Sequence, residues 1–138
     1  MTKVSKTITQ IIAFNQAASV YLSTRKDDDS SLCKSLRLVQ RKQIPPIFES
    51  FNDEISEAKR ANCATEPGSG RILRESNGNY SYTKDGERDM NIAVKNLAHK
   101  EYDIHQRLCE VNVDDLSVDD MFAFSGFVID EIKEEDYL

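Results

Sequence analysis

The sequence has few of the residues on which catalytic, metal and disulfide chemistry usually depends. Its 138 residues include no tryptophan, two histidines and three cysteines, with only three prolines and five glycines. No run of about 18 apolar residues occurs, which argues against a membrane-spanning helix. The polar start at Met1–Lys6 is not followed by an apolar stretch with a cleavage site, so we expect no secretory signal. With so little glycine and proline, the chain is not low-complexity and is expected to be mostly helical.

The cysteines are too scattered to predict a metal site or a disulfide framework. Cys33, Cys63 and Cys109 are far apart, and no Cys-x-x-Cys pair occurs. A structural zinc ion needs four ligands that usually come in close pairs. Acidic pairs such as Asp114-Asp115 do not follow the spacing of a calcium loop. We therefore expect three buried or half-buried thiols in a reducing cytosol, and neither a metal nor a cofactor.

Two histidines are the only side chains that would act as bases near neutral pH. His99 and His105 lie six residues apart on one predicted helix, so they point about 240° apart around its axis. A serine or cysteine nucleophile needs a base beside it and a third group to orient that base. The histidines cannot easily share such a site, and we expect the protein not to be an enzyme.

Charge is distributed unevenly along the chain. Its 24 acidic and 18 basic residues give a net charge of -6, which argues against a general polyanion binder. Residues 1–60 carry ten bases and seven acids, a net charge of +3, whereas residues 61–138 carry eight bases and seventeen acids, a net charge of -9. Such a chain can pair its own halves or stack with copies of itself.

A basic stretch follows one side of a predicted helix, at Lys34, Arg37, Arg41 and Lys42. It would suit an acidic protein partner or nucleic acid. No aromatic residues are interleaved with it, and a solvated helix face is the other interpretation. We do not expect nucleic acid as the partner.

Apolar residues recur at spacings of three and four, which predicts helices in most of the chain. Ser5–Thr24 is one such segment. A second begins at Leu32 and resumes after Pro45-Pro46, which should bend it sharply into two helices. A third runs from about Arg88 to Leu108. These segments predict a helical core formed by residues 5–63 and 88–109.

Asn77-Gly78 between two β-prone runs predicts a β-hairpin that protrudes at residues 71–84. A two-residue type I′ turn there sets Leu73 opposite Tyr82 and Glu75 opposite Tyr80, and Asp85-Gly86 should end the hairpin. Tyr80 and Tyr82 alternate and so face the same side. With Leu73 they would form an interaction surface, because tyrosine is enriched at interfaces; alternatively, all three cover the helices.

The C-terminal part predicts a small strand-helix unit at residues 110–132. Glu110-Val-Asn-Val-Asp114 alternates with period two, as a strand does. Ser117-Val-Asp-Asp120 resembles a capping box that opens a short helix. Residues 133–138 form an acidic tail that we expect to fray. The predicted fold is α+β and mainly α, a single domain over residues 1–138 in which three long helices pack antiparallel.

The order of these features resembles a family of small tailed-bacteriophage proteins. In that family a helical pair around a proline bend precedes an extended arm, and a strand of valine and acidic residues leads to a C-terminal helix. The corresponding features here are Pro45-Pro46, the hairpin and Glu110–Asp114. The resemblance covers roughly residues 5–130 and departs most in residues 64–86. It implies a phage origin and a role without catalysis, and the family provides no catalytic residues to carry over.

These observations predict a phage protein that acts through protein–protein contacts. We expect a structural or assembly component of the virion that associates with itself or with other phage proteins. The alternative is a soluble phage-encoded regulator or inhibitor that binds a host protein or a small effector. The expected location is the host cytoplasm during infection or the virion, without a membrane partner. The predicted interaction residues are Leu73, Tyr80, Tyr82, Lys34, Arg37 and Arg41.

Overall fold

The structure, a computed structural model, describes residues 2–132, with the exception of the Val113 side chain. These residues form a mainly helical α+β arrangement, as predicted from the sequence. Their one sheet is two-stranded and antiparallel, and it lies in segments that were predicted as helical. The acidic tail predicted at 133–138 lies outside the described residues. In chain order the elements are β1 (Lys3–Thr7), α1 (Ile8–Ser23), α2 (Ser31–Lys42), α3 (Ile44–Asn62), α4 (Lys84–Leu97), β2 (Glu101–His105), the 3₁₀ turn η1 (Val113–Asp115) and α5 (Val118–Phe124).

The chain forms two compact units. We call residues 1–48 and 101–138 the core unit, and residues 49–100 the helical hairpin unit. A single domain over the whole chain, with its long helices packed antiparallel, stays a prediction. Among the residues that the structure describes, no helix has the length and apolar character needed to cross a membrane.

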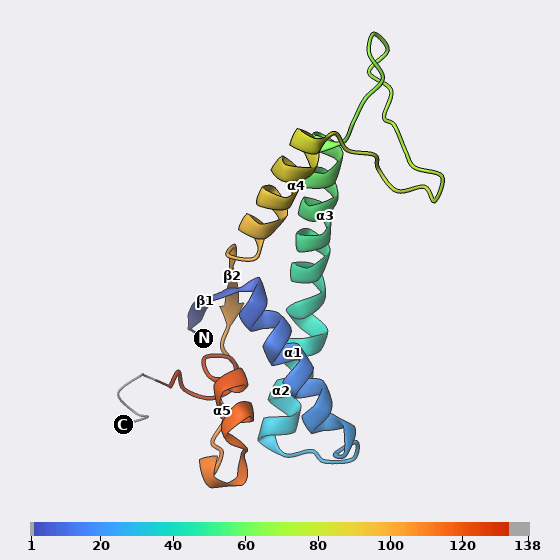
Figure 1. Cartoon of the computed structure of the whole chain (residues 1–138). Helices are drawn as coiled ribbons and strands as arrows, with labels where there is room; N and C mark the ends of the chain where they lie inside the picture. Colours follow the sequence, from blue (N-terminus) through green and yellow to red (C-terminus); the bar gives the residue numbers. More distant parts are fainter. Residues whose placement is uncertain (1, 133–138) are drawn as a thin grey trace. The chain divides into compact units, whose positions relative to one another are not determined.

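The core unit has a closed hydrophobic core. Within it α1 packs against α2 and α5 (Figure 1). The Phe14 ring stacks on Phe127 with centroids 4.2 Å apart and meets Phe124 edge-on at 5.9 Å. Such aromatic pairs add to the stabilisation that burial of their area provides. The buried core residues are Ile11, Phe14, Ala18, Leu32, Leu36, Val39, Ile44, Ile104, Leu116, Phe124, Phe127, Val128 and Ile129.

The first predicted helix starts three residues later than expected, because residues 3–7 form a strand. β1 pairs antiparallel with β2, and Val4 lies opposite Ile104. Thr7 then begins α1 as a capping box: its hydroxyl accepts from the Gln10 N–H at 3.3 Å, and the Gln10 side-chain oxygen accepts from the Thr7 N–H at 2.9 Å. A Thr-x-x-Gln pattern is a known helix start, so this boundary was readable from the sequence.

The predicted third helix over residues 88–108 is wrong at both ends. α4 begins at Lys84 and ends at Leu97, and residues 101–105 form β2. Glu101 falls where a continuing helix would need an apolar side chain. Tyr102 and Ile104 alternate with polar neighbours instead, and Ile104 is fully buried against the core. Every second side chain is therefore buried in this segment, as in a strand, and the helical spacing ends before it.

The predicted division into two helices is confirmed, since α2 ends at Lys42 and α3 begins at Ile44. The helix resumes before the prolines and not after them, because Pro45 and Pro46 lie in the first turn of α3, and a sharp bend stays a prediction. Gln43 lies between the two helices and joins this junction to β2. Its side-chain nitrogen donates to the His105 carbonyl, and its side-chain oxygen accepts from the His105 N–H, both at 2.8 Å. One amide thus satisfies both backbone groups at the end of the strand.

Gln43→Glu is expected to lower the free energy of unfolding by about 1–3 kcal/mol, because it removes the donor and leaves two oxygens facing each other. The loss should shrink at acidic pH, where protonation of the new carboxyl restores a donor. Urea unfolding at neutral and acidic pH measures both effects. Gln16→Glu, at an exposed position of α1, is the control and should change little. An equal effect of the two variants would contradict the role given to Gln43.

The strand predicted at residues 110–114 is wrong, whereas the following helix is confirmed. The segment that leads to η1 is held by backbone bonds instead: the Arg107 N–H donates to the Phe127 carbonyl at 2.8 Å and the Cys109 N–H to the Val128 carbonyl at 2.9 Å. Ser117 caps α5 by accepting from the Asp120 N–H at 3.1 Å. Val111 packs partly against the core without a strand partner.

Candidate functional site

The helical hairpin unit consists of the outer part of α3, the helix α4 and the connection between them. α4 runs alongside α3, and residues 63–83 form two loops at their shared end (Figure 1). Thr83 caps α4, since its hydroxyl accepts from the Gly86 N–H at 3.0 Å. Asp85-Gly86 therefore lies in the first turn of α4, and the prediction that it ends the hairpin is wrong.

Each of the two helices carries half-buried apolar side chains at helical spacing. We call these side chains the seam, which comprises Phe51, Ile55 and Ala58 on α3 and Met90, Ala93, Val94 and Leu97 on α4. All of them are half-buried, and no described residue of the unit is fully buried. The core unit, by contrast, has a complete core. A pair of helices without a buried centre gains little stability from its own packing.

The connection between α3 and α4 is tied together by backbone hydrogen bonds among three segments. The Leu73 N–H donates to the Ala64 carbonyl, the Ala64 N–H to the Ser81 carbonyl, and the Ser81 N–H to the Leu73 carbonyl, at 2.7–3.1 Å. These three bonds form a closed ring. The loops therefore have a defined shape at the end of the helices.

The predicted hairpin turn forms at Asn77-Gly78, but its type and register differ from the prediction. The Gly78 N–H donates to the Glu75 carbonyl and the Glu75 N–H to the Asn79 carbonyl, and within the turn Gly78 alone has a positive φ, of 87°. This is the three-residue hairpin loop with a glycine bulge. Arg74, not Glu75, therefore lies opposite Tyr80.

This shift of one residue moves Leu73 to the other face of the hairpin. Leu73 pairs with Ser81, whereas Tyr80 shares its face with Arg74. A slip of one residue exchanges the two faces of a strand. The predicted surface is thus divided: the two tyrosines lie together, and Leu73, 39% exposed, faces away from them.

Both tyrosines line a hollow between the hairpin and the two helices, which we call the tyrosine groove. The Arg74 guanidinium lies over the Tyr80 ring, 4.5 Å from its centre. Burial raises the pKa of the Tyr82 phenol. The groove measures about 480 Å³ and is lined by Lys59, Arg74, Glu75, Gly78, Asn79, Tyr80, Tyr82, Glu87 and Met90. Apolar, aromatic and charged groups meet here as they do at protein interfaces.

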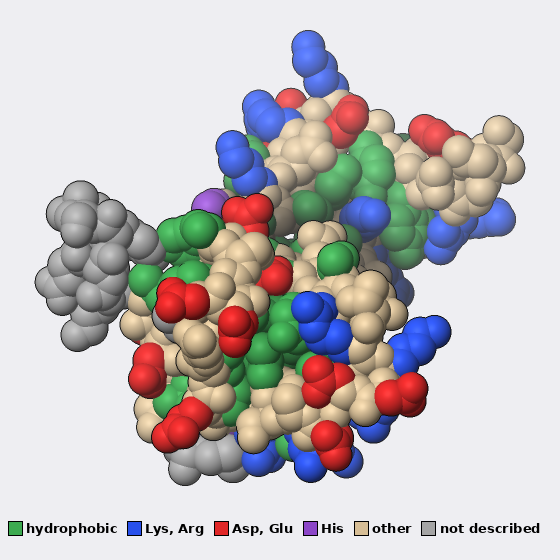
Figure 2. All heavy atoms as spheres, turned by 90° about the horizontal axis from the view of Figure 1, so that it is seen from below, with side chains coloured by type: hydrophobic (Ala, Val, Ile, Leu, Met, Phe, Trp, Pro, Cys, Tyr) green, Lys and Arg blue, Asp and Glu red, His purple; other side chains and the backbone are tan. Residues whose placement is uncertain are grey.

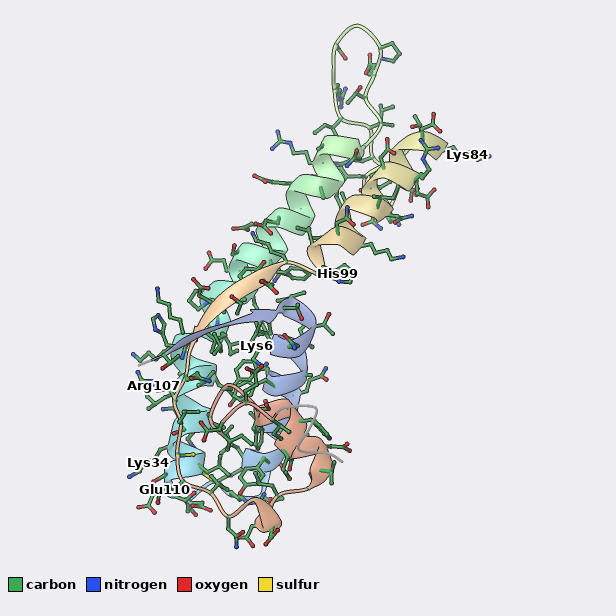
Figure 3. All side chains as sticks on the ribbon, turned by 90° about the vertical axis from the view of Figure 1, so that its left-hand side faces the viewer. Lys6, Lys34, Lys84, His99, Arg107 and Glu110 are labelled. Carbon is green, nitrogen blue, oxygen red and sulfur yellow. The ribbon has the colours of Figure 1, made fainter. Side chains whose placement is uncertain are left out.

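Of the three predicted basic interaction residues on α2, two are exposed and one is bonded within the protein. Lys34 and Arg41 are exposed, and Figure 3 shows Lys34 on α2. The Arg37 guanidinium, however, donates to the carbonyls of Arg25, Lys26 and Asp28 at 2.7–3.2 Å. It fastens the loop that precedes α2. Acidic and basic side chains are interspersed on the face of the molecule in Figure 2.

The histidines and cysteines lie on separate elements. His99 follows α4 and His105 ends β2, so they do not share a helix as predicted. All three cysteines are free, with Cys33 buried and the others half-buried, as expected from the sequence. Burial raises the pKa of the Cys109 thiol. Within residues 2–132, no three histidine, cysteine or acidic side chains come together in a group that would hold a metal ion.

A second hollow lies in the core unit beside Lys6, which is only 6% exposed. No pattern in the sequence indicated that this lysine is buried. Its ammonium pairs with the Glu131 carboxylate at 3.6 Å and lies 5.4 Å from the centre of the Phe127 ring. The charge of Lys6 is therefore balanced within the unit, and the tyrosine groove is the better candidate site.

Comparison with protein families, curated proteins and solved structures finds no match to this chain. The resemblance to tailed-phage proteins therefore stays a prediction.

Proposed function

We propose that the protein is a non-enzymatic assembly component of a tailed phage that associates with copies of itself through the helical hairpin unit. The observation that carries this proposal is that no described residue of the unit is fully buried. The two helices and the hairpin have defined positions, but their apolar seam stays partly exposed. A surface of this kind gains stability when a second protein covers it.

The composition of the exposed surface supports a protein partner. The tyrosine groove presents two aromatic side chains, a methionine and several charged groups. Tyrosine, methionine and arginine are enriched at protein interfaces, where rigid aromatic rings supply large contact areas. The phage origin rests on the order of sequence features that resembles the tailed-phage family.

Sedimentation of the full chain over a wide concentration range tests the self-association. We expect oligomers that dissociate on dilution, and mass spectrometry should find the protein in purified virions. A chain that stays monomeric at every concentration and is missing from virions would overturn the proposal. That result would favour the regulator that binds a host protein.

The double variant Tyr80→Ser/Tyr82→Ser is expected to weaken self-association by about tenfold or more, because truncation of a central aromatic anchor commonly costs this much. Both rings are only partly buried, so the thermal unfolding of the chain should change little. Sedimentation measures the first effect and circular dichroism the second.

Leu73→Ser is the matched control, because Leu73 lies on the opposite face of the same hairpin. It should leave association unchanged. If the control weakens association as much as the double variant, the groove is not the contact surface. An unfolded double variant would show instead that the tyrosines stabilise the unit itself.

A further inference from the structure

The outer side of α4, opposite the seam, carries a row of basic side chains. Lys84, Arg88 and Lys95 lie within about 40° of one another around the helix axis, and all three are exposed. Figure 3 shows Lys84 at the start of α4, pointing away from α3. We call these three residues the basic row. Ile92, 52% exposed, lies beside them.

The outer side of α3 carries acidic side chains in the corresponding place. Glu49, Asp53 and Glu57 follow one another at intervals of four residues and are all exposed, so they share the side of α3 opposite its apolar seam. We call them the acidic row. Glu54, on the flank of the helix, is already paired with Lys100.

The two rows give the helical hairpin unit one acidic and one basic side, with the seam between them. We infer that copies of the chain stack face to back, with the basic row of one copy against the acidic row of the next. This inference rests on the proposed function and specifies its partner as a second copy. It also specifies the contact as heterologous, which produces a ring or a filament rather than a closed two-fold dimer.

The spacing of the charges fits this contact. Lys84 and Arg88 are four residues apart, as are Glu57 and Asp53, so each pair spans about 6 Å along its helix. An antiparallel arrangement of α4 and the neighbouring α3 sets Lys84 against Glu57 and Arg88 against Asp53. Opposite charges at matched intervals favour one register over others.

The acidic residues next to the basic row on α4 do not prevent it from making this contact. Arg88 lies 3.9 Å from Asp85 and 3.6 Å from Asp89 on its own helix. Its side chain stays about two-thirds exposed there, and ion pairs so exposed contribute little. Arg60 lies at the end of the acidic row near the loops, which limits the row to Glu49–Glu57.

The surface that carries the basic row adjoins the tyrosine groove. Glu87 lines both the groove and a shallow hollow along the outer face of α4, which is otherwise lined by Lys84, Arg88, Asn91, Ile92 and Lys95. The two surfaces are therefore contiguous. A neighbouring copy seated on the basic row would reach the groove as well, so the charges would set the register while the aromatic rings supply contact area.

A charge-exchange experiment on the full chain tests the inference. The first variant is Lys84→Glu/Arg88→Glu/Lys95→Glu, which makes both sides of the unit acidic. The second is Glu49→Lys/Asp53→Lys/Glu57→Lys, which makes both sides basic. We expect each variant alone to be monomeric and an equimolar mixture to form oligomers in which the two alternate. Native mass spectrometry distinguishes the variants by mass and reads their order of assembly.

The control variant Lys3→Glu/Lys26→Glu/Lys42→Glu changes the net charge as much as the first variant does, but at exposed positions of the core unit. It should assemble like the unchanged chain. We further expect added salt to weaken assembly of the unchanged chain, because exposed charges are screened. Circular dichroism verifies that each variant keeps its helices.

Either of two outcomes would overturn the inference while the proposed function stands: both variants assemble by themselves, or their mixture stays monomeric although the unchanged chain assembles. Salt-independent assembly of the unchanged chain would overturn it as well. If the chain does not assemble under any condition, both the inference and the proposed function are wrong.

Discussion

Phe14→Ala is expected to lower the free energy of unfolding by about 3–5 kcal/mol, the range for deleting a fully buried aromatic ring. The Phe14 ring is completely buried, and it contacts both Phe127 and Phe124. Its removal leaves a cavity where α1 meets the C-terminal part of the core unit. Because the neighbouring rings stack against it, they cannot fill that space without losing their own contacts. Urea unfolding followed by circular dichroism measures the loss.

Val20→Ala on the same helix is the control for this measurement. Val20 is 73% exposed, so its truncation should change the free energy of unfolding by no more than about 0.5 kcal/mol. If Phe14→Ala costs less than about 1 kcal/mol, the ring is not packed as the structure describes. The comparison holds the helix constant and changes only the burial of the truncated side chain.

Features with a local cause were predictable from the sequence. The break between α2 and α3 follows from the missing proline N–H, because Pro45 and Pro46 are tolerated in the first turn of a helix and not in its interior. The start of α5 follows from the hydroxyl of Ser117, which reaches only the next turn. The helical segments of α1, α2 and α3 were predictable for the same reason, because an apolar period records which side of one helix is buried.

The β1–β2 sheet was missed because its cause is not local. Residues 3–7 pair with residues 101–105, which lie far along the chain, and each strand is only five residues long. In so short a segment, Ile104 and Leu108 also fit the stripe of a continuing helix. Only the partner strand and the core beneath Ile104 select the extended conformation.

The candidate site was predictable in composition but not in geometry. The alternation of Tyr80 and Tyr82 correctly placed both rings on one face. The position of Leu73 depended on whether the turn has two or three residues, and Asn-Gly is compatible with both. The basic row was not recognised, because the outer side of α4 is defined only once the start of the helix at Lys84 and its buried side are known. The sequence thus shows which types of side chain the site contains. Which of them share one surface depends on strand register and helix boundaries.

The contact of Gly86 with α3 reverses the usual effect of a glycine in a helix. Replacing a helical glycine with alanine normally stabilises the helix by about 1 kcal/mol. Here a Cβ atom on Gly86 would lie 2.5 Å from the backbone oxygen of Asn62 and 3.1 Å from the Thr83 hydroxyl oxygen. A backbone oxygen cannot move aside unless the end of α3 shifts. The first turn of α4 therefore approaches α3 closely only because residue 86 has no side chain.

Gly86→Ala is accordingly expected to destabilise the helical hairpin unit by about 1–3 kcal/mol, the usual cost of an overpacked contact. The unit has no fully buried residue to absorb this loss, so amide hydrogen exchange should accelerate in the first turns of α4, while the core unit keeps its protection. Asn91→Ala, at an exposed position of the same helix, is the control and should slow exchange slightly through helix propensity. Slower exchange in Gly86→Ala as well would show that α4 does not approach Asn62 closely. The placement of the seam and of the two charged rows on α3 and α4 would then be wrong.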